Sequence, residues 1–292
     1  MDWPRRSCAF ARGHLFRAMD NHWLHRFTIL VAVCTFLLVI AGSLVTSNDA
    51  ALSVPDWPLS YGKLIPPLEG GIRYEFAHRA LAALVAALTI TLAVWMERAG
   101  SLRWMRRVGW VAVVAVLAQA ALGGLVVRLI TPKAATIAHA CLAQLCFGLV
   151  VALAAGQSMQ LDELPRLNEP APLAAAVALF GQTILGAMVR YGATGVAYHI
   201  IGAAIATILV MWAGLRIPLR RPALALLTLT FSQVFLGVGA YMARVVNLTV
   251  PQPLPLTVSF TVAHVAVGSL AFGAAVVLTM APPLAHEGVA LA

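Results

Sequence analysis

Eight long apolar runs follow one another along the chain, separated by short polar or glycine- and proline-containing segments. A helix needs about 20 apolar residues to cross a bilayer core of roughly 30 Å. The pattern therefore predicts an all-α polytopic membrane protein with eight transmembrane helices, at about 27–46, 76–96, 108–128, 135–156, 172–190, 195–216, 223–244 and 257–281. Only Tyr191 to Thr194 separate the fifth run from the sixth, which predicts a tight hairpin.

The composition supports this class. Of 292 residues, 61% are hydrophobic and only 11% are charged, against about 25% charged in an average soluble domain. This excludes soluble, disordered and disulfide-stapled proteins, which could not bury so much apolar surface. The net charge of +9 indicates topology and not nucleic-acid binding, because 13 basic residues flank one side of the runs and 7 flank the other. The positive-inside rule then places both termini in the cytoplasm.

The runs contain an internal repeat. The third, fifth and seventh each carry Gln-x-x-Leu-Gly and end in an arginine: Gln119 to Gly123 and Arg128, Gln182 to Gly186 and Arg190, Gln233 to Gly237 and Arg244. The first run has a related segment, Ala41 to Val45. Each even-numbered run has one histidine: His78, His139, His199 and His264. The repeat predicts two pseudo-symmetric four-helix bundles in parallel orientation.

This repeat predicts the organisation of the whole chain. We expect a cytoplasmic N-terminal extension and not a signal peptide, because no small-residue cleavage site precedes the first run. The expected parts are the extension at 1–26, an N-terminal half at 27–156, a cytoplasmic linker at 157–171, a C-terminal half at 172–281 and a cytoplasmic tail at 282–292.

The four repeated histidines are the main candidate ligands. Each lies within about two turns of the outer end of its run, where a polar ring needs a partner. A single such histidine is more often structural, but four at equivalent depth favour ligation. Facing helices of a bundle present ligands to both faces of a flat cofactor, and neutral imidazole binds haem iron. We therefore predict two haem sites, His78 with His139 and His199 with His264.

Other metals and other histidines fit less well. Zinc is disfavoured because no cysteine or aspartate accompanies these histidines at ligand spacing. The remaining histidines lie outside the runs and are expected to be solvated: His14, His22, His25 and His286.

Four outer arginines lie at the depth of the histidines: Arg79, Arg128, Arg190 and Arg244. Guanidinium groups bind carboxylates such as haem propionates, and we predict cofactor binding for these residues. A role as interface anchors is equally consistent with their position. For the glycines of the repeat we favour a simpler interpretation, the close approach of helices.

One carboxylate distinguishes the halves. Glu75 stands three residues before His78, on the same helix face, where the other three histidines are preceded by Thr136, Val196 and Thr261. Glu75 either stabilises the helix dipole or serves the first site as a proton acceptor or a stabiliser of positive charge. The second interpretation predicts a reactive haem in the first half and an electron-carrying haem in the second. The loop at 46–62 is then either a lid over the first site or a simple connector.

These features together resemble the haem A synthase family. The resemblance rests on the segment Gly42 to Thr46, the loop Leu52-Ser53-x-Pro55-Asp56-Trp57-Pro58-Leu59, the motif Glu75-Phe76-x-His78-Arg79, the Gln-x-x-Leu-Gly repeats and the four histidines. It extends from about residue 27 to 281. The loop and the Glu-x-x-His-Arg motif are specific in combination, whereas the glycine pattern alone is not.

The resemblance implies an enzyme, a membrane oxidoreductase that oxidises the C8 methyl group of haem O to a formyl group. In the family the reaction is thought to proceed by successive hydroxylations and loss of water, and the haem A serves terminal oxidases. By motif, Glu75, His78 and His139 would belong to the substrate-haem site, and His199 and His264 would ligate a haem b cofactor. The resemblance also implies a bacterial inner membrane, with haem O synthase and a quinone or other electron acceptor as partners, and no nucleic acid.

The chain departs from the family in one respect. Many bacterial members carry two cysteines flanking the Trp-Pro-Leu segment of the first outer loop, where this chain has Val54 and Ser60. Its four cysteines all lie outside that loop, so a disulfide within the loop is excluded.

The main alternative is a non-catalytic di-haem b-type membrane electron carrier, which has no evident need for Glu75. A transporter is disfavoured because the repeats are parallel and the middles of the spans carry no charges. The prenyltransferase that forms haem O is disfavoured because no span carries an aspartate-rich Mg-diphosphate motif.

Overall fold

The computed structural model describes residues 6–161, 170–216, 220–246, 251 and 253–281. Most of the predicted linker and all of the predicted tail at 282–292 therefore lie outside the described residues. Within these ranges the chain forms eight helices and no strand: α1 (Arg6–Ser47), α2 (Ile72–Arg98), α3 (Arg103–Arg128), α4 (Lys133–Ser158), α5 (Pro170–Arg190), α6 (Val196–Arg216), α7 (Arg220–Val246) and α8 (Pro255–Thr279). All eight are long and apolar enough to cross a membrane, which confirms the prediction of an eight-span helical membrane protein.

The helix ends follow local sequence signals. No proline interrupts residues 6–47, so α1 runs through most of the predicted N-terminal extension and continues into its span, His22–Ser47. The hairpin between α5 and α6 turns at Gly192, whose φ of 65° suits a residue without a side chain. Pro255 stands at the start of α8, where its missing N–H has no intrahelical partner to lose.

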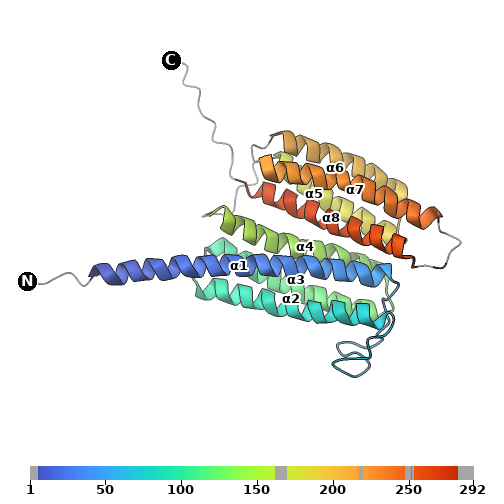
Figure 1. Cartoon of the computed structure of the whole chain (residues 1–292), viewed down its shortest axis with the longest axis horizontal. Helices are drawn as coiled ribbons and strands as arrows, with labels where there is room; N and C mark the ends of the chain where they lie inside the picture. Colours follow the sequence, from blue (N-terminus) through green and yellow to red (C-terminus); the bar gives the residue numbers. More distant parts are fainter. Residues whose placement is uncertain (1–5, 162–169, 217–219, 247–250, 252, 282–292) are drawn as a thin grey trace, which may run out of the picture.

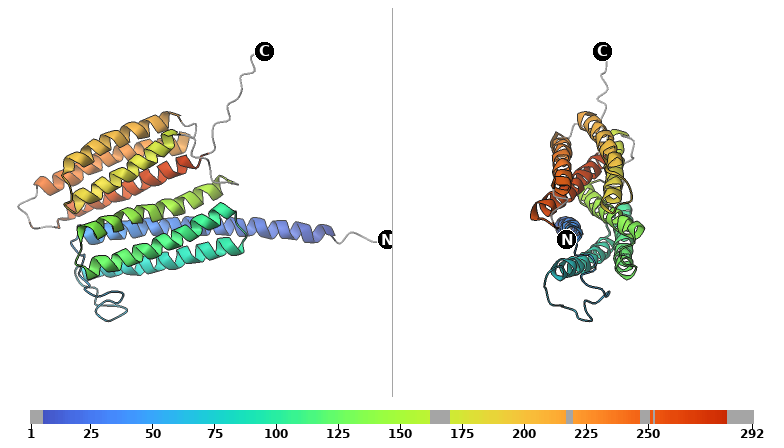
Figure 2. Two further views of the ribbon diagram at one scale, coloured as in Figure 1. Left: turned by 180° about the vertical axis from the view of Figure 1, so that it is seen from behind. Right: turned by 90° about the vertical axis from the view of Figure 1, so that its right-hand side faces the viewer.

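The helices form two groups of four (Figures 1 and 2). In the first group α1 packs against α2 and α4, and α3 packs against α2 and α4. The second group repeats this order with α5 to α8. The diagonal helices, α2 with α4 and α6 with α8, make no backbone contact within the described ranges, so each group encloses a centre that their side chains can share. The groups meet along a seam formed chiefly by α4 and α8, with α1 and α5 beside them.

The seam has mirrored contacts. A Cβ at Gly148 of α4 would lie 2.9 Å from the Phe272 ring of α8, and one at Gly273 of α8 would lie 3.1 Å from the Phe147 ring of α4. Beside these contacts, Gln144 Nε2 donates a hydrogen bond of 2.8 Å to Ser269 Oγ, and both side chains are buried. Each aromatic ring thus occupies space left by a glycine of the opposite half.

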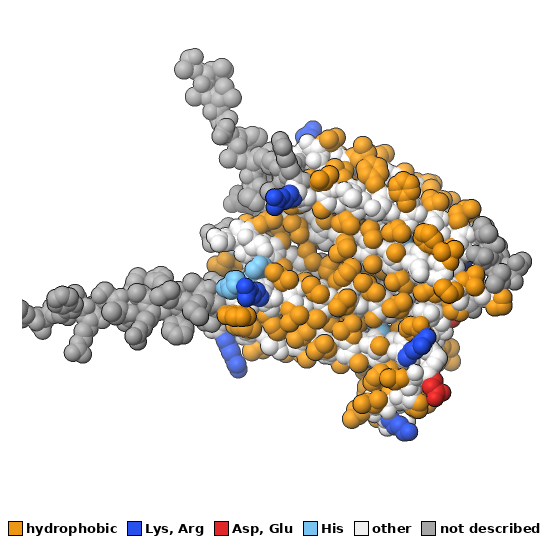
Figure 3. Space-filling view, in the orientation of Figure 1, with side chains coloured by type: hydrophobic (Ala, Val, Ile, Leu, Met, Phe, Trp, Pro, Cys, Tyr) orange, Lys and Arg blue, Asp and Glu red, His pale blue; other side chains and the backbone are white. Residues whose placement is uncertain are grey.

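The outward surface is apolar, as a lipid environment requires. Figure 3 shows hydrophobic side chains over the helical body and basic side chains near its two ends. One tail histidine differs from expectation, because half-buried His25 contacts Gln157 Oε1 and Ser158 Oγ of α4, both at 3.2 Å. His22 is exposed as expected. The His14 side chain and His286 lie outside what the structure describes.

Candidate functional site

The four repeated histidines lie in two pairs inside the two helix groups. His78 of α2 faces His139 of α4, with ring centroids 6.5 Å apart and ring planes at 77°. His199 of α6 faces His264 of α8, with centroids 6.2 Å apart and planes at 78°. In both halves the pair spans the diagonal, so the rings meet at the centre of each group. The two sites are near copies in geometry.

A glycine of the preceding odd-numbered helix lies against each of these rings. A Cβ would come within 3.1 Å of the ring Cε1 at Gly42, Gly186 and Gly237, and within 3.2 Å at Gly123. Their partners are, in the same order, His78, His199, His264 and His139. The favoured sequence interpretation, general helix approach, is therefore too broad, because each glycine leaves room for one imidazole.

The glutamines of the repeat fix the same histidines through their backbones. Gln119 Nε2 donates to the carbonyl of His139 at 2.9 Å, and Gln182 Nε2 donates to the carbonyl of His199 at 2.8 Å. Gln233 makes the same bond to His264. The first helix has Leu38 at this place in the repeat. The sequence predicted no role for the glutamine, although it recurs four residues before the glycine once in each of these three hairpins, and each of these hairpins carries one of the histidines.

Each pair fits a metal held between two imidazoles. A metal–nitrogen bond of about 2 Å on each side, plus the rings themselves, separates the two ring centres by about 6 Å. The Nδ1 atoms of His78, His139 and His264 are buried without a hydrogen-bond partner among the described residues, an arrangement that costs free energy unless a ligand compensates. In the described ranges no group of three or more His, Cys, Asp or Glu side chains could hold a metal ion. Two imidazoles that face each other are a donor set that suits an iron with further ligands from a cofactor.

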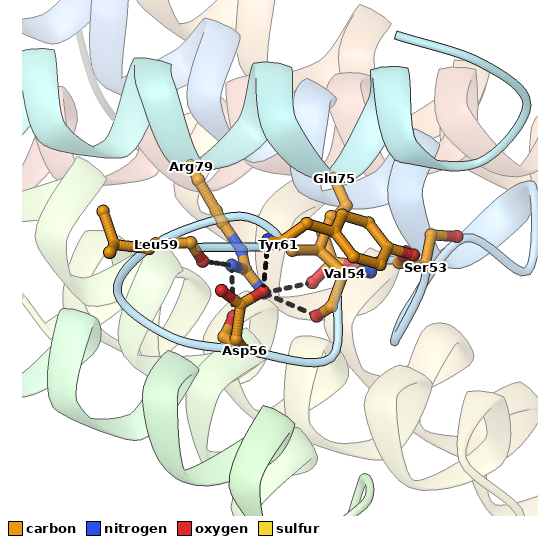
Figure 4. A network of polar contacts seen from close by, with 7 residues as sticks. All are labelled: Ser53, Val54, Asp56, Leu59, Tyr61, Glu75 and Arg79. Carbon is orange, nitrogen blue, oxygen red and sulfur yellow. Dashed lines mark hydrogen bonds and ion pairs between the residues drawn. The ribbon is translucent and has the colours of Figure 1, made fainter. Parts of the chain in front are cut away.

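Glu75 and Arg79 of α2 bind the loop between α1 and α2 (Figure 4), and His78 lies on the same helix between them. Arg79 Nη1 donates to the carbonyls of Asp56 at 2.7 Å and Leu59 at 3.0 Å. Its Nη2 donates to the Val54 carbonyl at 3.0 Å and pairs with Glu75 Oε1 at 2.6 Å. Glu75 is buried, and its Oε2 accepts the Val54 N–H at 2.9 Å. Both side chains therefore fasten the loop to α2.

The loop closes on itself and reaches α3. The Asp56 carboxylate accepts the N–H groups of Gly62 at 2.8 Å and Tyr61 at 2.6 Å, and these bonds hold the Asp56 pKa below its ordinary value of 3.8. The Trp57 ring lies where a Cβ at Gly124 would come within 2.9 Å. Gly124 follows the glycine that contacts His139, so the loop abuts the wall of the first site.

The remaining arginines have different surroundings. Arg128 is exposed at the end of α3. Arg190 and Arg244, at the ends of α5 and α7, line one cavity together with Thr46 and Ser47 at the end of α1. Of the four predicted arginines, Arg190 and Arg244 therefore lie together at the seam. Arg79 binds carbonyls of the loop.

The chain resembles curated proteins from several bacteria. No protein-family model matches it. It is 32% identical over 106 residues to a protein named "Heme A synthase" from Lysinibacillus sphaericus and 44% identical over 62 residues to one from Symbiobacterium thermophilum. It is also 32% identical over 140 residues to one from a Methylobacterium species. The chain is similar to the haem A synthases.

This similarity confirms the resemblance predicted from the motifs. It covers only part of the chain. The matched segments cover 35%, 21% and 42% of this chain, in the same order. The chain spans 34%, 20% and 38% of the length of these haem A synthases.

Proposed function

We propose that this chain is a membrane oxidoreductase that converts haem O to haem A by oxidising the C8 methyl group to a formyl group. The observation that carries the proposal is the combination of two equivalent histidine pairs with a carboxylate beside only one of them. The similarity to proteins named haem A synthase supports the same assignment.

In this proposal the halves divide the work. His78 and His139 would hold the substrate haem O, and His199 and His264 would hold a haem b that serves electron transfer. When bound, haem iron supplies the redox chemistry. The protein fixes the position of each haem with two opposed imidazoles, which the glycines and glutamines orient. The docked loop lies against the wall of the first site, where the Trp57 ring meets Gly124.

Glu75 is proposed to accept protons in the first site. Its carboxylate is buried one helical turn before His78 and is kept in place by Arg79 and the Val54 N–H. The matching positions offer no such group, because the Thr136 and Thr261 hydroxyls donate to carbonyls of their own helices, at 3.0 and 2.7 Å. This difference supports chemistry in the first half and electron transfer in the second.

The setting is also part of the proposal. The excess of basic residues on one side supports cytoplasmic termini in a bacterial inner membrane. A haem O synthase would supply the substrate, and a quinone or another acceptor would take the electrons.

Co-expression with a haem O source, followed by haem extraction and chromatography, tests the proposal. We expect haem A and haem b from the wild type. Glu75→Gln keeps the shape of the side chain but removes the proton acceptor, so it should yield haem b with a low-spin bis-histidine spectrum and no haem A. Thr136→Val, one turn before His139, is the matched control and should still yield haem A.

The alternative function predicts a different result. A di-haem electron carrier would give haem b from the wild type and no haem A even when haem O is present. Haem A from Glu75→Gln at the wild-type level would remove Glu75 from the mechanism.

A further inference from the structure

A cavity of about 70 Å³ lies at the outer end of the seam between the two halves; we call it the seam cavity. The first half contributes Thr46 and Ser47 at the end of α1. The second half contributes Arg190, Arg244 and the first turns of α8. Thr261, which also lines the cavity, stands one turn before His264, so the cavity adjoins the second histidine pair from outside.

The charges around the seam cavity do not balance. Among the described residues that line it, Arg190 and Arg244 carry guanidinium groups and Asp49 carries the single carboxylate. Among the described residues, the ion pairs join Arg79 to Glu75 and Arg106 to Glu97, and neither involves these two arginines. Arg190 is half-buried and Arg244 is exposed, and two guanidinium groups beside one carboxylate give the cavity a positive potential that favours an anion.

The hydrogen bonds at the cavity also leave donors free for an anion. Half-buried Arg190 donates from Nη2 to Ser47 Oγ at 3.2 Å. That bond leaves the Ser47 hydroxyl proton available to a ligand oxygen. The hydroxyls of Thr46 and Thr261 instead donate to carbonyls of their own helices. The donors left for a ligand are therefore guanidinium N–H groups and one hydroxyl, which suit an oxyanion.

We propose that the seam cavity binds one oxyanion group, a carboxylate or a phosphate, through Arg190 and Arg244. Its volume suits a single such group and not a whole macrocycle. The group has two possible sources, a propionate of the haem on His199 and His264 or the phosphate of a phospholipid. The first source rests on the proposed function, and the second does not. In both cases the anion joins the end of α1 to α5 and α7, and so ties the two halves together.

The test compares wild type, the double variant Arg190→Gln/Arg244→Gln and the control Arg73→Gln. Arg73 is an exposed arginine outside the cavity, stacked on the neighbouring Tyr74 ring. Transfer of haem b from purified holoprotein to apomyoglobin measures haem dissociation. Native mass spectrometry of the same samples measures retained phospholipid. Loss of two charge-assisted contacts should accelerate haem dissociation about tenfold or more, or abolish phospholipid retention. The control should match wild type in both measurements.

A haem ester separates the two sources. Haem b dimethyl ester lacks propionate charges, so a propionate contact predicts equal dissociation of the ester from wild type and double variant. Phospholipid loss with unchanged haem dissociation assigns the cavity to a phosphate. Unchanged values in both measurements overturn the proposal.

The same samples distinguish this proposal from the proposed function. Wild-type protein without a bis-histidine haem would contradict the proposed function, while phospholipid retention would still report on the cavity. If circular dichroism shows that the double variant does not fold, the single change Arg244→Gln, at an exposed side chain, replaces it.

Discussion

At the scale of single residues, the repeat is explained by what each position does to a histidine. The glycine leaves space for the imidazole, and the glutamine four residues earlier bonds the histidine carbonyl. A small residue is therefore required at Gly186 not for flexibility but because His199 Cε1 lies 3.1 Å from a Cβ placed there. In a close-packed interior, even one added methyl group displaces the neighbouring side chain.

Gly186→Ala should displace the His199 ring and disturb the second site. If this site holds the proposed haem b, we expect loss or broadening of its low-spin signal in absorbance and electron paramagnetic resonance spectra, because the bond from an imidazole to iron would depend on ring position. Gly181→Ala is the matched control, since a Cβ added at this glycine of the same helix would meet nothing within 4 Å. A normal haem signal from Gly186→Ala would show that the ring can move without loss of ligation.

At the scale of elements, the loop between α1 and α2 is held in place without a disulfide. Val54 and Ser60, which flank the Trp-Pro-Leu segment of the loop, are both buried. Arg79 instead binds three carbonyls of the loop, and Asp56 closes its tip onto Tyr61 and Gly62. The loop is therefore ordered by hydrogen bonds to charged groups, which are stronger than neutral ones.

The Asp56 bonds give the loop a pH dependence. Because the N–H groups of Gly62 and Tyr61 lower the Asp56 pKa, their contribution is complete above the ordinary value of 3.8 and is lost as the pH falls through the depressed pKa. Hydrogen exchange, corrected for intrinsic rates, should show that the Tyr61 and Gly62 amides are protected down to the depressed pKa of Asp56. Below that pKa the two amides should exchange freely. Asp56→Asn should remove the transition, and a transition well above pH 3.8 would contradict this assignment.

Sequence patterns predicted the elements well and the loop poorly, for a physical reason. Apolar runs of span length fix the helices, and four repeated histidines at equal depth indicated two pairs. The partners of Arg79 within the loop are backbone carbonyls, which every residue possesses, so the spacing of side chains does not reveal them. Arg190 and Ser47 meet only because the halves pack along the seam. Their contact depends on tertiary structure and has no local signal.

At the scale of the whole molecule, the seam keeps the relation of the two sites fixed. α4 and α8 each carry one histidine of a pair, and the offset from His139 to His264 also relates Gln144 to Ser269. The same offset relates the two phenylalanines that pack on glycines of the opposite half. The two halves therefore meet through equivalent positions. At the phenylalanine and glycine positions the residue types are also the same, whereas at the polar contact Gln144 faces Ser269.

Ser269→Ala tests how far that polar contact stabilises the seam. The change removes the acceptor of the Gln144 amide, whose Oε1 is already buried without a partner in the described part of the chain. A buried donor left unsatisfied should lower the free energy of unfolding by about 1–3 kcal/mol. Ser232→Ala is the control, because this partly exposed serine donates to the Thr228 carbonyl of its own helix. Thermal unfolding in detergent should separate the two variants, and equal stability would mean that the phenylalanine–glycine contacts hold the seam alone.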